Sequence, residues 1–218
     1  MKRIVIGDIH GNMSYYKHLI ELTIPNKYGK DNQTIQVGDF GFKGSHNWFL
    51  ANVYDHNNPR KHSINFGNHD DYNFLDQPYS LGNWSYDETE DYSLMTIRGA
   101  KSIDRGMRKE GKDWFENEEM NYEELDELLE IWEDLRPDVV VSHDIPQFVQ
   151  QRLYGFYDDS ITRNYMQMMF ERHQPKLWLF GHYHDGSRIM LEGTQFINVA
   201  TSDYICVEDE LEKLNQTI

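Results

Sequence analysis

The sequence predicts an α/β domain, in which strands alternate with helices and the helices cover much of the sheet. Three observations support this fold class. Short apolar segments have the length of strands, amphipathic patterns separate them, and a glycine followed by polar residues often comes directly after a strand. With 218 residues, the chain is long enough to bury its own core, and the simplest expectation is a single domain over 1–218.

The first half of the chain is expected to contain three strands separated by two helices. The helices are predicted over 13–22, ending before Pro25, and over 45–53. The strands are predicted over 2–6, over 33–37 and in the segment before Gly67, where Ile64 and Phe66 alternate with polar residues.

In the second half, the clearest helix is predicted over 121–135 and is stopped by Pro137. Its apolar residues recur every three or four positions and are expected to share one face: Tyr122, Leu125, Leu128, Leu129, Trp132 and Leu135. Strands follow at 139–141 and 177–180, and 187–191 with 195–199 predict a hairpin across Glu192-Gly193. The segment 72–118 is aromatic, polar and weakly periodic, so we interpret it as an inserted region of loops and short strands beside the substrate.

Composition excludes several classes of protein. The formal charge of −16 argues against an extended nucleic-acid-binding surface. Much of it comes from 116–134, an acidic stretch that we interpret as a solvated helix face. No apolar run is long enough to span a membrane, and the N-terminus lacks the apolar stretch of a signal peptide. The single cysteine, Cys206, excludes an intrachain disulfide and favours a cytoplasmic location.

Polar residues that suit a metal follow five of the predicted strands. The segments "GDIHGN", "GDFG", "GNHD", "SHD" and "GHYH" supply Asp8, His10, Asp39, Asn68, His143, His182 and His184. Because sites in open α/β sheets form at the carboxyl ends of strands, these side chains are expected to meet. Oxygen and imidazole donors without sulfur suit a pair of divalent ions such as manganese, iron, nickel or zinc. His69, next to Asn68, is expected to face the substrate.

Each of these motifs also has a purely structural interpretation, as a turn or a helix cap, and the metal hypothesis depends on all five occurring together. The remaining histidines have no partner at the spacing of metal ligands and are expected to lie on the surface: His18, His46, His56, His62 and His173.

The five motifs, in this order and over residues 7–184, resemble those of the calcineurin-like metallophosphoesterase superfamily. The stretch 98–115 and the acidic helix after it look like its small bacterial and phage-type branch. The resemblance implies a four-layer αββα sandwich with mixed sheets flanked by helices and a metal pair at one edge. It also implies that Asp8, His10 and His184 hold one ion, that Asn68, His143 and His182 hold the other, and that Asp39 bridges them. A metal-bridging hydroxide would then attack phosphorus, and His69 would protonate the leaving oxygen.

The chain departs from the phosphoprotein phosphatases of this superfamily, which carry an Asp-Arg pair after the bridging aspartate and an arginine before "GNH". Phe42, Lys43 and Phe66 occupy those positions here. The departure removes the usual carboxylate partner of the catalytic histidine and weakens the case for a phosphoprotein substrate.

We therefore expect a metal-dependent phosphoesterase that hydrolyses a small, nucleotide-like phosphodiester or phosphomonoester, most simply with manganese. Arg105 and Arg108 are candidate substrate contacts, and Trp114 and Phe115 could stack on a base. The alternatives are a phosphoprotein phosphatase, a nuclease of long nucleic acids and a non-catalytic scaffold. The sequence does not indicate the oligomeric state.

Overall fold

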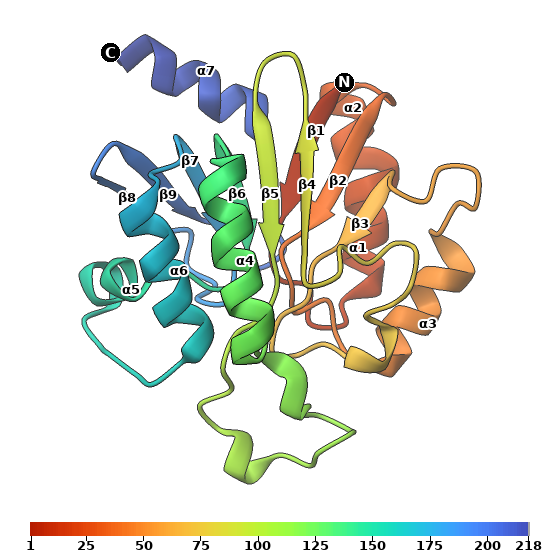
Figure 1. Cartoon of the computed structure of the whole chain (residues 1–218). Coiled ribbons are helices and arrows are strands. Elements are labelled where there is room, and N and C mark those ends of the chain that lie inside the picture. The colour runs from red at the N-terminus through yellow and green to blue at the C-terminus, as the bar shows by residue number, and fades with distance from the viewer. Residues whose placement is uncertain (218) are drawn as a thin grey trace.

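The structure is a computed structural model of the chain and describes residues 1–217 (Figure 1). Its first sheet has four strands in the order β10-β1-β2-β3. Strands β1 (Lys2–Ile6), β2 (Asn32–Gln36) and β3 (His62–Ile64) are parallel, and β10 (Tyr204–Cys206) runs antiparallel to β1. The register pairs Ile4 with Thr34 and Thr34 with His62.

The second sheet has six strands in the order β4-β5-β6-β7-β9-β8. Its parallel centre consists of β5 (Ser93–Ile97), β6 (Val139–Ser142), β7 (Leu177–Phe180) and β9 (Thr194–Asn198). Antiparallel strands form both edges: β4 (Trp84–Glu88) beside β5 and β8 (Arg188–Leu191) beside β9. The predicted hairpin is thus confirmed, and Glu192 and Gly193 turn it with φ angles of 49° and 86°.

Helices cover the outer face of each sheet. The first sheet packs against α1 (Met13–His18), α2 (Ile24–Tyr28) and α3 (Lys43–Asn52), and the second against α4 (Tyr122–Leu135), α5 (Gln147–Tyr154) and α6 (Ile161–Arg172). The last helix, α7 (Val207–Thr217), lies at the end of the sandwich where β1 begins (Figure 1).

Alternation along the strands divides the core into three parts. Val140 in β6 packs toward α4, whereas Val139 and Val141 face the opposite sheet. In the same way Val5 faces inward between the sheets while Ile4 faces the helices of the first sheet. This period of two buries both faces of both sheets, so the four-layer αββα sandwich is confirmed.

Two details differ from the sequence-based expectations. Pro25 does not end the helical segment, because a π-helical turn over Leu19–Thr23 leads into α2 and places the proline in the first turn of that helix, where its missing N–H costs little. Tyr122 is 63% exposed, so it does not belong to the buried face of α4. It follows Asn121, whose side chain caps the helix together with Glu124.

The region 72–118 contributes strands to the sandwich. β4 and β5 form an antiparallel edge of the second sheet. Residues 98–121, between β5 and α4, belong to no strand. We call residues 98–121 the substrate-side segment. It contains short 3₁₀ turns over Arg105–Met107 and Glu116–Glu118. Among the described residues, no helix has both the length and the apolar character needed to cross a bilayer.

Candidate metal centre

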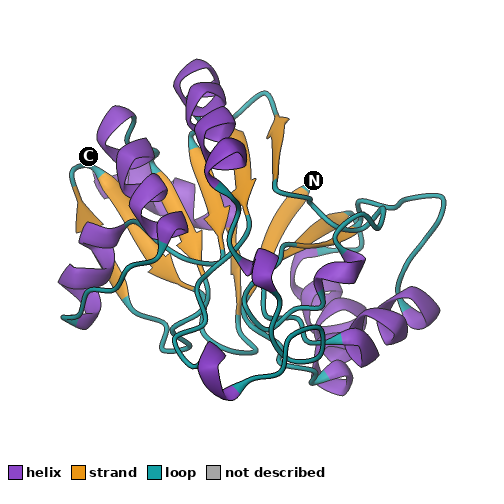
Figure 2. Ribbon diagram, turned by 60° about the horizontal axis from the view of Figure 1, so that its bottom comes forward, coloured by secondary structure: helices purple, strands orange, loops and turns teal. Residues whose placement is uncertain are grey.

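The seven predicted ligands lie in loops at one end of the sandwich. These loops follow β1, β2 and β3 in the first sheet and β6 and β7 in the second, and Figure 2 shows loops gathered beyond the strand ends. The parallel arrangement of these strands within each sheet places their carboxyl ends side by side. The sequence therefore brings residues 174 positions apart, such as His10 and His184, into contact.

The backbone at these loops adopts a conformation that side chains other than glycine usually avoid. In the described part of the chain, seven non-glycine residues have a positive φ, and four of them are His10, Asp39, His182 and His184. Left-handed backbone costs of the order of 1–3 kcal/mol at such a residue. This backbone turns the loops after β1, β2 and β7 sharply after their strands and directs their side chains into one site.

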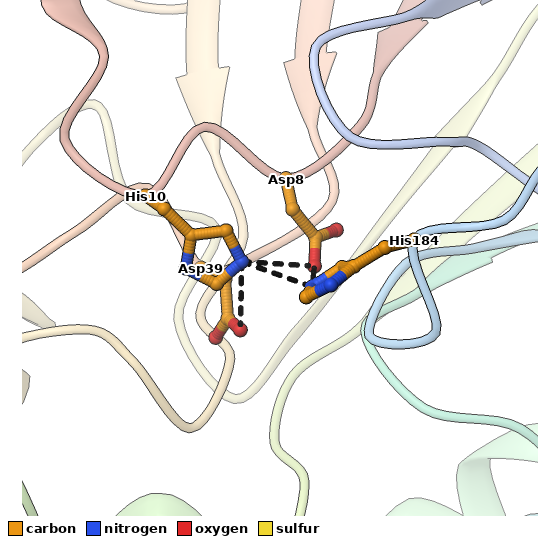
Figure 3. A group of neighbouring side chains, drawn as sticks. All are labelled: Asp8, His10, Asp39 and His184. Atoms are coloured by element: carbon orange, nitrogen blue, oxygen red, sulfur yellow. Dashed lines mark hydrogen bonds and ion pairs between the residues drawn. The ribbon is translucent and has the colours of Figure 1, made fainter.

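The first group of donors consists of Asp8, His10, Asp39 and His184, whose ligand atoms all lie within 4.8 Å of one another. Figure 3 shows the four side chains converging. His184 Nε2 lies 2.8 Å from Asp8 Oδ2 and 2.9 Å from His10 Nε2. His10 Nε2 lies 3.8 Å from Asp39 Oδ2.

The second group consists of Asp39, His143 and His182, again within 4.8 Å of one another. Its closest pair is His143 Nε2 and Asp39 Oδ1, 3.2 Å apart, and Asn68 Oδ1 lies 3.3 Å from the same nitrogen. Asp39 thus directs Oδ2 toward the first group and Oδ1 toward the second. One carboxylate shared in this way is the arrangement that two-metal sites use.

The burial of the two carboxylates is consistent with bound metal cations. Asp8 is 0% exposed and Asp39 is 1% exposed, and a buried carboxylate is costly without positive charge nearby. Burial raises the pKa of Asp39, but the neighbouring His143, His69 and His10 outweigh it and hold that pKa well below its usual range. Burial lowers the pKa of His143, yet Asp39 raises it overall. The donor set, two buried carboxylates with imidazoles and an amide, fits a pair of divalent transition ions.

At two positions only glycine leaves enough space for the donor side chains. A Cβ added at Gly67 would lie 2.4 Å from Asp39 Oδ1 and 2.5 Å from His143 Nε2. A Cβ added at Gly181 would lie 2.3 Å from Asp8 Oδ1. Any side chain at these positions would displace a proposed ligand, which explains the glycine that introduces each of these motifs.

Asp70, for which no role was predicted, connects the loops after β2 and β3. Its Oδ2 accepts hydrogen bonds from the backbone N–H groups of Asp39 and Gly67, both at 2.8 Å, and its Oδ1 accepts one from Gly41 at 2.9 Å. The buried carboxylate thereby fixes the backbone of the residue that both donor groups share. Its position directly after "GNH" is the only sequence feature that could have indicated this role.

His46 contradicts the expectation of a surface histidine, because it is wholly buried. Its ring stacks between Phe66 and Phe74, with centroid distances of 5.2 and 5.0 Å. Its Nδ1 lies 3.1 Å from the Tyr79 hydroxyl and its Nε2 lies 3.5 Å from Asp70 Oδ1. His46 therefore packs beside Asp70. His18 and His56 are exposed as expected.

The substrate-side segment is joined to the site through Ser102. The Asn68 side-chain amide donates to Ser102 Oγ at 3.2 Å, and Ser102 donates from Oγ and from its backbone N–H to the Glu118 carboxylate at 2.6 and 2.7 Å. The bond from its Nδ2 orients the Asn68 amide so that Oδ1 faces His143. Partners of this kind orient metal ligands.

His69 and Arg108 are in contact at the mouth of the site. Arg108 Nη2 donates to His69 Nε2 at 2.8 Å, while Arg108 Nε pairs with Asp104 Oδ1 at 2.7 Å. Burial lowers the pKa of His69; Asp39 opposes this shift and Arg108 reinforces it. Arg105 is exposed and is not among the residues that line the cavity described below.

Two of the phenylalanines singled out from the sequence are buried. Phe66 is fully buried and Phe115 is 8% exposed in the same core cluster, so neither offers a surface to a substrate. Phe115 packs near Tyr72, with ring centroids 6.1 Å apart. Phe42 is partly exposed, and its ring centroid lies 6.0 Å from that of His69.

A cavity of about 440 Å³ opens over the site. Its walls include donors from both groups together with residues of the substrate-side segment and of the loop between α5 and α6. The lining comprises Asp39, Asn68, His69, Lys101, Ile103, Asp104, Arg108, Phe156, Asp158, Arg163, His182, Tyr183 and His184. The volume falls within the ~300–1,000 Å³ that is usual for small-molecule sites.

The sequence matches the family model of calcineurin-like phosphoesterases over residues 1–186. The chain belongs to this family. It is therefore a metallophosphoesterase, a phosphoric ester hydrolase that depends on divalent metal ions, and the two donor groups are candidates for holding them.

Solved structures support the fold. A phosphopantetheinyl hydrolase from Mycobacterium tuberculosis aligns with 14% identity and a TM-score of 0.57, covering 92% of this chain and 90% of that one. A Staphylococcus aureus protein assigned as a 5′-nucleotidase aligns with 17% identity and a TM-score of 0.54. That alignment covers 93% of this chain but only 49% of the other, so this chain spans about half the length of the staphylococcal protein.

A third similar structure is a Plasmodium protein described as the anchor in the inner membrane complex, with 13% identity, a TM-score of 0.53 and coverage of 93% and 72%. At these identities the likeness concerns the fold alone. No curated protein matches the sequence.

Proposed function

We propose that this metallophosphoesterase uses two metal ions to hydrolyse small phosphate esters. Asp8, His10 and His184 would hold one ion and Asn68, His143 and His182 the other, with Asp39 between them. The observation that carries the proposal is the division of the Asp39 carboxylate, whose two oxygens face the two donor groups.

The ions would be divalent transition metals, with manganese the first choice and iron, nickel or zinc as alternatives. When bound, they would supply an activated water and positive charge for the phosphoryl oxygens. The protein's own contribution is to fix the donors. Asp70 holds the loop of Asp39, and Ser102 orients the Asn68 amide.

His69 and Arg108 would act on the substrate. In this structure the Arg108 guanidinium donates to the His69 ring, but a phosphoryl oxygen is a stronger acceptor because the hydrogen bond is then charge-assisted on both sides. Arg108 would therefore turn to the phosphoryl group. His69 would face the leaving oxygen and protonate it as a general acid.

The size of the cavity favours a small ester over a phosphoprotein. About 440 Å³ accommodates a phosphoryl group with a nucleoside-sized substituent. Positions 42 and 66 carry phenylalanine where the related phosphatases have arginine, so a dianionic monoester finds less positive charge than in those enzymes. We therefore propose phosphodiesters and nucleotides as substrates ahead of phosphopeptides.

The single domain and the cytoplasmic location also remain predictions.

The proposal is tested by a panel that crosses metals with substrates, on protein purified without chelator. Manganese, iron, nickel, zinc and magnesium would each be combined with a phosphodiester, a nucleotide monoester and a phosphopeptide. We expect the highest kcat/KM with manganese and a diester or nucleotide. A clear preference for phosphopeptides would contradict the substrate class, and no turnover with any metal would contradict the proposed hydrolysis.

The role of His69 is tested with His69→Ala and two leaving groups. We expect the variant to retain its metals and to lose about 10²–10⁴-fold in rate on an alkyl ester. The loss should be smaller with p-nitrophenolate, which leaves without a proton. His18→Ala, at an exposed position on α1, is the matched control. Equal losses on both esters would assign His69 to another role.

A further inference from the structure

Exposed apolar side chains concentrate in the two loops that border the cavity. Ten large apolar residues are exposed in the described part of the chain, and four belong to these loops: Ile103 and Met107 in the substrate-side segment, and Phe156 and Tyr157 between α5 and α6. Figure 1 shows both loops at the same end of the sandwich as the strand-end loops. Apolar surface gathered beside a polar site is a feature of ligand-binding clefts.

Two of the four side chains line the cavity itself. Ile103 is 82% exposed and Phe156 is 46% exposed, and both belong to its wall. Met107 and Tyr157 do not line it, although they are more exposed than Phe156. Each loop thus presents one apolar residue to the cavity and one to the solvent.

The aromatic wall behind Phe156 is held in place. Tyr183 stacks on Tyr154 with ring centroids 4.0 Å apart and donates its hydroxyl to Asp144 Oδ1 at 3.1 Å. The Phe156 ring lies 6.5 Å from both tyrosine rings. Since Tyr183 stands between His182 and His184, this wall begins directly beside two proposed ligands.

Outside the proposed metal donors, the basic side chains of the cavity wall each have an acidic partner, either in the wall or behind it. Lys101 pairs with Asp159, Asp104 with Arg108, and Arg163 with Asp158 and Asp144. Apart from the proposed metal ligands and Arg108, which would contact the phosphoryl group, the wall therefore offers little unbalanced charge to a leaving group. A charged leaving group, such as a polyphosphate or an acidic peptide, would gain little here, whereas a neutral planar group would bury apolar surface.

We propose that Phe156 and Ile103 form a leaving-group subsite that takes a neutral aromatic ring, such as a nucleobase or a benzyl group, attached to the phosphoryl group. The ring packs against Phe156, with Tyr154 and Tyr183 behind it, and Ile103 contacts it from the other loop. The inference rests on the proposed function, because the phosphoryl group must be anchored at the metal centre.

Binding of phosphonates tests the subsite without any turnover, since their P–C bond is not hydrolysed. The full chain with manganese would be titrated with benzylphosphonate, cyclohexylmethylphosphonate and methylphosphonate. We expect the benzyl compound to bind about tenfold more tightly than the methyl compound, from the stacking of one ring, and the cyclohexyl compound to lie between them.

The variants separate the two loop positions from their neighbours. Phe156→Ala should abolish the preference for benzylphosphonate and leave methylphosphonate binding unchanged, whereas Phe156→Tyr should retain the preference. Ile103→Ala should reduce the preference about threefold, because it removes a smaller apolar contact. Tyr157→Ala and Met107→Ala, which alter exposed apolar residues outside the cavity wall, are the matched controls and should retain it.

The outcomes distinguish this inference from the proposed function. Equal affinity for benzyl and methyl phosphonates, or no binding of either, would overturn the subsite, and equal affinity for benzyl and cyclohexylmethyl phosphonates would overturn its aromatic character. If the benzyl preference and its loss in Phe156→Ala are observed while no ester is hydrolysed, the subsite stands and only the proposed hydrolysis fails.

Discussion

The strand-end loops and the substrate-side segment border the same cavity but are built differently. In the strand-end loops, Asp8, Asp39 and His143 are at most 1% exposed, and the backbone of Asp39 is fastened by Asp70. The substrate-side segment has short 3₁₀ turns in place of long helices or strands and leaves Met107 86% exposed. Buried loops that directly follow the strands therefore hold the proposed chemistry, and a more exposed segment presents the surface that would meet the variable part of a substrate.

This difference predicts two kinds of mutational effect. Changes at the strand ends should lower metal occupancy and kcat, because they move donors whose geometry is fixed by the sheets. Changes in the substrate-side segment should mainly alter KM or stability, because that segment reaches the donors only through contacts such as Ser102 with Asn68.

Asp39→Asn should have the largest effect, a loss of about 10³-fold in kcat, the scale of removing one key electrostatic group. Because its two oxygens face both donor groups, the variant should lose occupancy at both. Asp8→Asn is the control, since Asp8 belongs to one group only, and it should affect one ion. Metal analysis of both variants provides the measurement, and undiminished two-ion occupancy in Asp39→Asn would exclude a bridging role.

Asp70→Asn should lower metal affinity by about 10–100-fold, the usual cost of removing a partner that orients a ligand. The backbone N–H groups of Asp39, Gly41 and Gly67 now donate to Oδ1 and Oδ2 of Asp70. An asparagine would place an NH₂ group, itself a donor, opposite some of these N–H groups. Asp71→Asn makes the same chemical change at a neighbouring buried residue that bonds to Asn73 instead. Metal retained after dialysis should fall in the first variant only; a fall of equal size in both would point to general destabilisation.

The clustering of the strand-end donors could be predicted from the sequence because each motif is local. A strand, a glycine and a polar residue are adjacent in the chain, and the parallel sheets bring the motifs together. The burial of His46 depends instead on Phe66, Phe74 and Tyr79, which are contributed by distant segments. The role of Asp70 involves backbone N–H groups, which carry no side-chain identity in the sequence.

The substrate-side segment was harder to predict for the same physical reason. Its apolar residues follow no regular spacing, so the sequence did not indicate which aromatic side chains would be buried in the core. Phe115 enters the core beside Tyr72, whereas Phe156, in another loop, lines the cavity. Only tertiary packing decides between these outcomes.

Arg108→Ala should raise KM for the preferred substrate about tenfold and leave metal content unchanged, because a lost charge-assisted hydrogen bond to a phosphoryl oxygen has about that cost. Arg105→Ala removes the same charge from an exposed residue outside the cavity wall and should change KM less than twofold. Steady-state kinetics and metal analysis of the two variants make the comparison. Equal effects in both would indicate a long-range effect of charge instead of a contact.

The smallest effect is expected in the pH dependence of stability, through Glu118 in the substrate-side segment. Burial raises the pKa of this carboxyl, although hydrogen bonds from Ser102 oppose the shift. Between the unfolded pKa, about 4.3, and the higher folded pKa, the folded state binds more protons than the unfolded state. Stability contributed by this group must therefore be greatest below the unfolded pKa and fall as pH rises through the folded pKa.

Glu118→Gln removes this titration. The free energy of unfolding, measured in urea from pH 4 upward, should therefore fall less steeply with pH in the variant than in the parent protein. Glu116→Gln, at an exposed position in the same turn, is the control. A steeper fall in Glu118→Gln would show that the Ser102 hydrogen bonds outweigh burial, and identical slopes would show that the two effects cancel. Either result would contradict the raised pKa.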